Sequence, residues 1–446
     1  MLDSSQNLIN QPNLQSLNKK VLILTYYWPP SGGAGVQRWL KLSHYLAQQG
    51  VEVHVLVPKG DYASYTVLDP SLAQEIDESI TVHETKSFEP LGIYAKLFGK
   101  KSIPSAGFGN VDKKNWKQQL IISLRTNLFI PDPRKYWKSY AYSAAKEIIK
   151  EHCIHNVITS SPPHSVQLIG RKLKKNFDIN WVADFRDMWT DIYYYELLNQ
   201  SKYSHHRNLR YEKQVIENAD HIVTATPIYI PFFTSKSDKV SDAKFTSIPN
   251  GYDPKDFEKF IYKRNHKFVI TYTGTISEQY NINPFLDALA QFRNQFSDSS
   301  FTFQFVGSIY PQLHQDLQKR KLNDVTIFSP YVPHRESIKF LEKSSMLLVC
   351  GPLNKDAQEG GIPAKVYEYL AARKPIINIG KKDGFVAEVL EETHAGKSFD
   401  NDSTAILKYL LLTYENWLAG KEMPPNNSIK KYSRPNQAKS FLGLLK

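Results

Sequence analysis

Short apolar runs alternate with longer segments of helical periodicity along most of the chain. They read VLIL, VEVHVLV, NVITS, WVAD and HIVTA in the first half, and FVITYTG, FTFQFVG, VTIF, MLLVCG and PIINIG in the second. Strands that are apolar at nearly every position are buried on both faces, as in a parallel sheet that helices cover on each side. The sequence therefore predicts an α/β fold.

The predicted strands form two groups, separated by a polar stretch at residues 247–267 that contains an Asn-Gly turn signal. The 446 residues exceed the roughly 250 to 300 at which a single core stops growing, so we expect two doubly wound domains. Such domains bind ligands beyond the carboxyl ends of their strands, and we expect the two to face each other across a cleft there. The predicted boundaries are a disordered tail at 1–19, a first domain at 20–250 with an insertion at about 60–150, a linker at 251–266, a second domain at 267–430, and a C-terminal helix at 431–446 that returns to the first domain.

A glycine-rich loop, YYWPPSGGAGVQRW, follows the first apolar run. Gly33 and Gly35 match the start of a G-x-G-x-x-G dinucleotide motif, but Arg38 stands where a third, small residue is needed. The second strand also runs into Pro58, without the acid that binds a ribose in such sites. These departures argue against a nicotinamide site. The loop either needs glycine only for its backbone angles, or brings bare backbone close to a ligand held mainly by the other domain.

The motif GGIPAKVYEYLAARKPIINIG, at residues 360–380, predicts a helix in the second domain. Pro363 suits the first helical position, and the free N–H groups after it form an anion site to which Lys365 adds a charge. Glu368 lies one turn further on the same face, where a carboxylate can accept both hydroxyls of a ribose. The alternative is an amphipathic helix whose Lys and Glu are merely solvated.

This helix is one of several motifs that occur together in a known order. With VITSSPPHS, WVADFRDMW, SIPNGYD, YTGT and SPYVPHRESIKFLEKSSMLLV, it resembles the retaining glycosyltransferases of family-4 type (glycosyl transferases group 1), which have the GT-B fold. The resemblance extends from about residue 20 to the end of the chain. It implies a retaining hexosyl- or N-acetylhexosaminyltransferase that builds a cell-surface polysaccharide, such as lipopolysaccharide, or a glycolipid in a bacterium. The donor, a UDP- or GDP-sugar, is a substrate, and no cofactor is implied.

The resemblance also implies roles for single residues of the donor site. Glu368 would bind the ribose, and the backbone at Ala364 with Lys365 would bind the diphosphate. Gly32 and Gly33 would let the first domain close over the donor. The other implied donor-site residues are Gly274, Thr275, Tyr331, Val332, Gly361 and Pro363.

Three residues of the first domain are further candidates for catalysis. His164 matches the position where similar enzymes have a histidine near the transferred sugar, although a loop histidine is otherwise a surface residue. Arg186 and Asp187 follow the next strand, at the same predicted edge. They either pair with each other structurally or contact the donor or acceptor.

The sequence departs from the family in two places. Many members carry a glutamate eight positions before the ribose-binding one, where this chain has Gly360, and the adjacent Glu359 is the candidate replacement. Members also carry an Arg and a Lys after the first strand of the second domain, where this chain reads GTISEQYNINP. Because the departing diphosphate develops about two negative charges, another cation must replace them. Lys365, Arg186 and the helix amino terminus are the candidates, and no metal is predicted.

Two other functions remain open. Nucleotide-sugar 2-epimerases share the GT-B architecture, but they lack the PAKVYEYLA helix and need no acceptor groove, for which the insertion is suited. A non-catalytic nucleotide-sugar binder is consistent with the missing Arg and Lys. No partner of nucleic-acid type is implied.

Basic residues are concentrated in one part of the chain. The net charge is +12, and residues 89–150 alone contain twelve Lys and Arg against four acids, a difference of +8. In this segment Trp116, Leu120, Ile121, Leu124 and Leu128 recur at helical spacing, while Lys117 and Arg125 fall elsewhere on the helix. The pattern predicts contact with an anionic membrane surface. Alternatively, the apolar face packs on the first domain and the basic residues are only solvated.

The sequence also predicts where the protein acts. Its two cysteines, Cys153 and Cys350, lack metal-ligand spacing and fit a reducing cytoplasm. No apolar stretch reaches the roughly 18 residues of a membrane span, and the polar N-terminal residues do not resemble a signal peptide. We therefore expect a cytoplasmic protein, peripheral on the inner face of the cell membrane.

Overall fold

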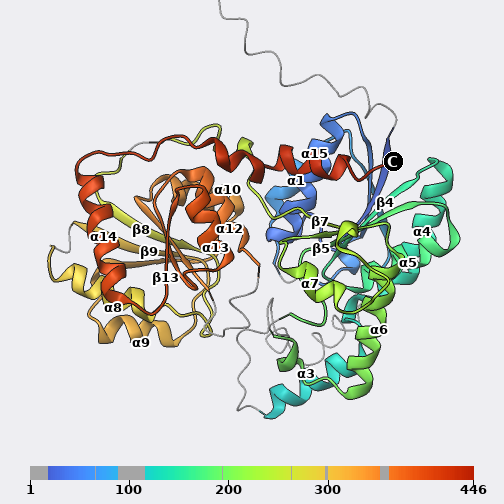
Figure 1. The fold of residues 1–446 in the computed structure, drawn as a ribbon, viewed down its shortest axis with the longest axis horizontal. Coiled ribbons are helices and arrows are strands. Elements are labelled where there is room, and N and C mark those ends of the chain that lie inside the picture. Colours follow the sequence, from blue (N-terminus) through green and yellow to red (C-terminus); the bar gives the residue numbers. More distant parts are fainter. Residues whose placement is uncertain are drawn as a thin grey trace, which may run out of the picture. The chain divides into compact units, whose positions relative to one another are not determined.

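The computed structural model describes residues 19–65, 67–88, 116–192, 194–262, 264–296, 300–351 and 361–446. The predicted tail, Glu359 and Gly360, and much of the basic segment therefore lie outside the described residues, as do the side chains of 116–119 and 121. The chain divides into two compact units (Figure 1). The first takes the described residues up to Pro249 together with Arg434–Lys446, and the second is Asn250–Ser433.

The first unit contains a seven-stranded parallel sheet in the order β3-β2-β1-β4-β5-β6-β7. Its strands are β1 (Lys20–Leu24), β2 (Glu52–Pro58), β3 (Thr81–Thr85), β4 (Asn156–Ser161), β5 (Asn180–Phe185), β6 (His221–Thr224) and β7 (Phe245–Ser247). Every residue of β4 and β5 is buried, as the continuous apolar pattern predicts.

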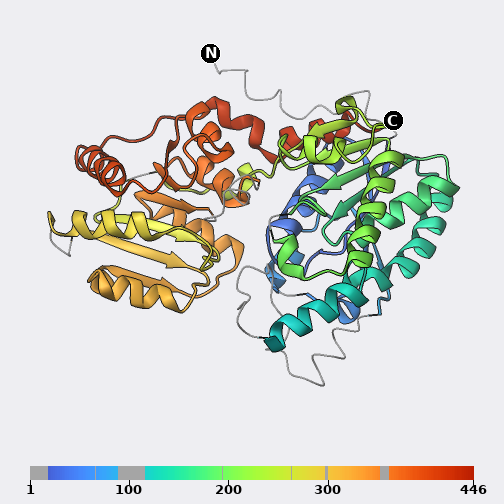
Figure 2. The ribbon, with the colours of Figure 1, turned by 60° about the horizontal axis from the view of Figure 1, so that its bottom comes forward.

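Helices cover both faces of this sheet. They are α1 (Ala34–Gln48), α3 (Trp116–Leu128), α4 (Trp137–Glu151), α5 (Ser165–Asn176), α6 (Lys202–Asn218), α7 (Tyr229–Thr234) and α15 (Arg434–Leu442). Alternate residues of β1 serve opposite faces: Val21 and Ile23 pack with α1 and α15, whereas Leu22 and Leu24 pack with α4 and α5. Figure 1 shows α15 lying beside α1, and Figure 2 shows α4 to α6 on the other face.

The second unit contains a six-stranded parallel sheet in the order β10-β9-β8-β11-β12-β13. Its strands are β8 (Phe268–Thr273), β9 (Phe301–Val306), β10 (Thr326–Ser329), β11 (Met346–Cys350), β12 (Ile376–Ile379) and β13 (Gly396–Phe399). The helices are α8 (Asn283–Arg293), α9 (Gln312–Lys319), α10 (His334–Glu342), α12 (Ala364–Ala372), α13 (Phe385–Glu392) and α14 (Ser403–Leu418). Residues of α8, α9 and α14 pack on one face and residues of α10, α12 and α13 on the other. The predicted α/β class with two doubly wound sheets is confirmed.

Strand order determines where each unit can hold a ligand. In both sheets the order reverses beside the first strand, between β1 and β4 and between β8 and β11. The loops after such a pair of strands separate and leave a crevice at the carboxyl edge. The glycine-rich loop follows β1, and Gly274 follows β8, so both motifs stand at a switch point.

No helix in the described ranges is both long and apolar enough to cross a membrane.

A buried ion pair lies at the switch point of the first unit. Arg38 and Asp184 have no exposed side-chain surface, and Arg38 donates from Nη2 to Oδ1 at 2.8 Å and from Nε to Oδ2 at 3.3 Å. Its other donor bonds reach the carbonyls of Ile248 at 2.9 Å and Pro249 at 2.8 Å. Trp39 Nε1 also donates to Asp184, at 3.0 Å. Arg38, which breaks the dinucleotide motif, thus joins α1 to β5 and to the end of the unit's last strand.

We expect Arg38→Met to destabilise the first unit by about 3 to 5 kcal/mol, because it leaves Asp184 buried without its cation. Chemical denaturation, followed by a probe of the first unit, measures the change. The matched control in the same unit is Lys146→Met, which removes an ion pair between the partly exposed side chains of Lys146 and Glu147 and should change the stability far less. Equal effects of the two substitutions would contradict the role given to the buried pair.

Candidate active site

The candidate residues of the second unit gather at the carboxyl edge of its sheet, around the start of α12. The helix begins at Ala364 with Pro363 as its N-cap residue, one position later than predicted. The difference is small because a proline fits either position, having no N–H to pair. Tyr369 holds the helix against β8: its hydroxyl accepts a hydrogen bond from the N–H of Thr273 at 2.9 Å.

Lys365 extends from this helix toward the loop after β8. Its Nζ lies 3.8 Å from the centre of the Tyr272 ring. A Cβ added to Gly274 would lie 3.1 Å from the same atom, so the ammonium group is beside this glycine. Burial lowers the pKa of Lys365 to about 8, although Cys350 and Glu368 oppose the shift. A cation thus lies beside the loop after β8, where the resemblance implies an Arg and a Lys and this chain has neither.

Glycines allow the loops after β8 and β9 to approach each other closely. Gly274 and Gly307 have φ of 102° and 132°, in a region that favours glycine. A Cβ on Gly307 would lie 2.3 Å from the carbonyl oxygen of Gly274. Thr275 follows in the same loop, and its carbonyl accepts a hydrogen bond from the Tyr272 hydroxyl at 2.8 Å. Any side chain at Gly307 would therefore displace this loop from Lys365.

Glu368 lies one turn beyond Lys365, with 22% of its side chain exposed. Its Oε1 is 3.8 Å from Nδ1 of His334, whose Nε2 is 3.1 Å from Oδ2 of Asp256. His334 is the first residue of α10 and directly follows the loop that contains Tyr331 and Val332. The loop with the implied donor-site residues Tyr331 and Val332 and the predicted ribose acceptor Glu368 are therefore neighbours.

Sequence reasoning missed His334, although it stands in the quoted motif SPYVPHRES. Its proximity to Glu368 depends on how α10 and α12 pack, which helical periodicity does not encode. Gly361 lies two residues before Pro363, at the approach to the same helix.

The candidate residues of the first unit meet at the carboxyl ends of β4 and β5. Arg186 donates from Nη2 to the carbonyl of Pro162 at 2.5 Å and from Nε to that of Ser161 at 3.3 Å. These two carbonyls belong to the loop that leads to His164, so Arg186 fixes that loop. Its hydrogen bonds go to these backbone groups rather than to Asp187. Burial lowers the pKa of Arg186 and raises the pKa of Asp187.

His164 is partly buried and packs against an aromatic residue of the unit. Its ring stacks on Trp189 with centres 4.8 Å apart and planes at 9°. Burial, reinforced by the charge of Arg186, lowers the pKa of His164 to about 3, so its imidazole is neutral. Its buried Nδ1 has no hydrogen-bond partner among the described residues. The ring therefore retains an unused polar atom next to Arg186.

The glycine-rich loop has separate structural reasons for its glycines. Gly33 has φ of 101° as the N-cap residue of α1, and nothing lies within 4 Å of where its Cβ would be. A Cβ on Gly35, in contrast, would lie 1.7 Å from Nη1 of Arg186. The N–H of Gly32 donates to the carbonyl of Val67 at 3.0 Å. Backbone angle therefore requires glycine at 33, and close approach of Arg186 requires it at 35.

A separate hollow of about 1020 Å³ lies in the second unit. Ser345, Pro375 and Gly396 line it, and each of these residues precedes or begins a strand. The hollow is therefore at the amino edge of the sheet, whereas the candidate donor residues are at the carboxyl edge. We assign the donor to the carboxyl edge because the switch point and the helix amino terminus are there.

Comparison with known proteins identifies the fold and a family pattern in the second unit. Residues 254–434 match the family model described as glycosyl transferases group 1, and no curated protein matches the chain in sequence. Among solved structures, HepE of Anabaena in complex with UDP-glucose is 14% identical, with a TM-score of 0.58 over 95% of this chain and 99% of that one. A variant of S. aureus TarM in complex with UDP is 10% identical, with a TM-score of 0.58 over 96% and 99%.

WaaG, a glycosyltransferase involved in lipopolysaccharide biosynthesis, is 13% identical, with a TM-score of 0.53 over 95% of this chain and 99% of that one. At these identities the likeness establishes the fold, while the family match covers the range in which the candidate residues of the second unit lie. The chain has the GT-B fold, and its residues 254–434 carry the pattern of the glycosyl transferases group 1, which supports glycosyl transfer.

Proposed function

We propose that the protein is a retaining glycosyltransferase that moves a sugar from a nucleotide-sugar to a cell-surface polysaccharide or glycolipid. The observation that carries the proposal is the arrangement of Lys365 and Glu368 on α12, next to Gly274 and His334 respectively. Such a helix offers an anion site, a cation and a ribose acceptor within two turns. UDP-glucose and UDP, bound by HepE and TarM, are donor and product of the proposed class.

Lys365 is the proposed replacement for the missing Arg and Lys. Departure of the nucleoside diphosphate concentrates negative charge, and a cation already aimed at that position stabilises the transition state. Arg186 and the unused Nδ1 of His164, in the first unit, are proposed to act at the sugar. This assignment needs no metal ion at the donor site.

The overall activity is tested with a panel of nucleotide-sugars and candidate acceptors. We expect release of nucleoside diphosphate only when an acceptor is present, and an anomeric configuration in the product, read by NMR, that matches the donor. Isomerised sugar without an acceptor would instead identify an epimerase. Tight donor binding without release would identify a binder.

Glu368→Ala should raise the donor Kd by roughly 10- to 150-fold, because about 1.5 to 3 kcal/mol of hydrogen bonding to a charged acceptor is lost. Calorimetry with the nucleotide-sugar measures the change. Glu388→Ala, which removes an exposed carboxylate from the neighbouring α13, is the matched control and should bind normally. An unchanged donor Kd in a folded Glu368→Ala variant would show that α12 has only a structural role.

Donor affinity should weaken as the pH rises above about 8. The diphosphate favours the charged form of Lys365, so above its free pKa of about 8 binding must be accompanied by proton uptake. The donor Kd should then rise by up to about tenfold per pH unit. Lys365→Arg remains charged throughout and should give a flatter profile. A Kd of the unaltered protein that stays constant from about pH 7 to 9.5 would argue against a contact between Lys365 and the diphosphate.

We further propose that α3 places the enzyme on the inner face of the cell membrane, beside a lipid-linked acceptor. Leu120, Leu124 and Leu128 recur every four residues on α3 and are 51%, 51% and 63% exposed. The opposite side of the helix packs inward through Ile122, which is 1% exposed. The exposure of these three leucines supports membrane contact over the alternative in which the apolar face of the helix packs on the first domain. Lys135 lies at the end of the row, with Nζ 2.8 Å from the carbonyl of Leu128.

The double variant Leu124→Gln, Leu128→Gln should lose most binding to anionic vesicles in a co-sedimentation assay. The unaltered protein should bind phosphatidylglycerol vesicles, bind neutral ones poorly, and detach as salt shortens the Debye length from about 10 Å at 0.1 M. Leu412→Gln, at an equally exposed leucine of α14, should bind like the unaltered protein. Equal recovery of the unaltered protein in the supernatant with both lipids would contradict membrane contact.

A further inference from the structure

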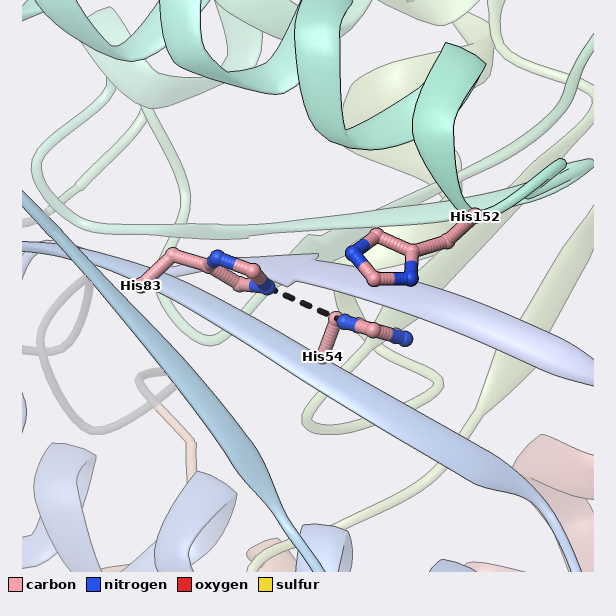
Figure 3. Close-up of side chains that lie close together, drawn as sticks. All are labelled: His54, His83 and His152. Atoms are coloured by element: carbon pink, nitrogen blue, oxygen red, sulfur yellow. Dashed lines mark hydrogen bonds between the residues drawn. The ribbon is translucent and has the colours of Figure 1, made fainter.

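Three histidines that the sequence keeps far apart meet in the first unit, as Figure 3 shows. His54 comes from β2, His83 from β3, and His152 follows the last residue of α4. We propose that they form a binding site for a transition-metal ion of zinc type. The site is separate from the donor site and does not depend on the function proposed above.

The geometry brings one nitrogen of each ring to a common centre. The three candidate ligand atoms all lie within 4.8 Å of one another, in the single group of this kind among the described residues. Nδ1 of His54 is 3.0 Å from Nε2 of His83, and their rings stack with centres 5.3 Å apart. The His152 ring lies over His54, at 4.3 Å between centres.

The fold explains why these side chains converge. In the register between β2 and β3, His54 pairs with Thr81 and Leu56 pairs with His83, so both histidines point to the same face of the sheet. Helix α4 crosses this face: at its start, Trp137 Nε1 donates to Thr85 Oγ1 at 2.8 Å. Its other end carries His152 back toward the beginning of β2, above His54.

The donor set suits Zn²⁺. Zinc binds imidazole nitrogens at about 2.0 to 2.1 Å in a tetrahedron, which separates adjacent ligand nitrogens by about 3.4 Å. The 3.0 Å between the nitrogens of His54 and His83 needs only a small rotation to reach this value. Three histidines leave one position for water. The absence of carboxylates among the three ligands disfavours Mg²⁺ and Ca²⁺, which prefer oxygen.

A carboxylate already orients the central histidine. Nε2 of His54 is 2.9 Å from Oε1 of Glu52, which is positioned to accept its N–H. That hydrogen bond leaves the lone pair on Nδ1, the atom that faces His83. A metal-bound histidine commonly donates its other N–H to a carboxylate in this way, which fixes the tautomer and strengthens the ligand.

The position of the site indicates what a bound ion would do. His54 lies near the beginning of its strand, and His152 precedes β4, so the cluster is toward the amino edge of the sheet. His164 and Arg186 instead follow the carboxyl ends of β4 and β5. A bound ion would therefore stabilise the fold rather than take part in sugar transfer. His83 and His152 also bracket the long connection from β3 to α4, so one ion closes a large loop and secures the edge strand.

The test uses the full-length protein, freed of metal by dialysis against a chelator. Titration with Zn²⁺ in competition with a chromophoric chelator should give one tight site per chain, and the melting temperature should rise on binding. Co²⁺ should give the visible absorption of a tetrahedral site. Donor binding by the metal-free protein should be unchanged, which separates this site from the donor site.

His83→Gln and His152→Gln should each weaken Zn²⁺ binding by at least tenfold. His205→Gln with His206→Gln, which changes two histidines of α6 outside the cluster, should retain the site. Zinc binding that survives both cluster substitutions would overturn the proposal. So would the absence of a tetrahedral Co²⁺ spectrum in the unaltered protein, a result that does not depend on how any variant folds.

Discussion

The buried ion pair between Arg38 and Asp184 is the interaction on which the candidate residues of the first unit depend. Two charges without solvent are tolerated because each is surrounded by partners: Asp184 also accepts hydrogen bonds from Trp39 and Ser160, and Arg38 also binds two backbone carbonyls. Asp184 lies two residues before Arg186 in the chain, so the bonds that fix Asp184 also help to position Arg186. Arg186 in turn fixes the loop that presents His164. The guanidinium of Arg38 lies 5.5 Å from the centre of the Phe441 ring, which brings the C-terminal helix α15 into this arrangement.

The candidate residues of the second unit are arranged with less buried charge. Its strand order repeats that of the first unit, but the switch point is shaped by glycines at 274 and 307 and by the hydroxyl of Tyr369. Lys365 is partly buried over an aromatic ring and carries a lowered pKa, so its charge is incompletely compensated. A cation whose charge is not fully paired within the protein can stabilise the negative charge of a nucleoside diphosphate. In the first unit the candidate polar groups are therefore held by hydrogen bonds to the backbone, whereas in the second unit a cation lies at the beginning of a helix.

The opposite edges of the sheets have different chemistry. In each unit the candidate residues stand at the carboxyl edge of the sheet, where loops diverge at a switch point and helix amino termini collect. The three histidines stand toward the amino edge of the first sheet, where the carboxyl end of α4 meets the beginnings of strands. This separation keeps the proposed metal site of the first unit apart from His164 and Arg186, the candidate residues at the carboxyl edge of the same sheet.

The sequence by itself determined the features that depend on neighbouring residues. Apolar runs predict buried parallel strands, and the spacing of Lys365 and Glu368 predicts one helix face, because both patterns are set by local backbone geometry. Only the tertiary structure decided that Arg38 pairs with Asp184, that His334 lies beside Glu368, and that His54, His83 and His152 meet. Each of these contacts joins residues from different elements. Strand order, register and helix packing bring such residues together, and none of the three is encoded in hydrophobic periodicity.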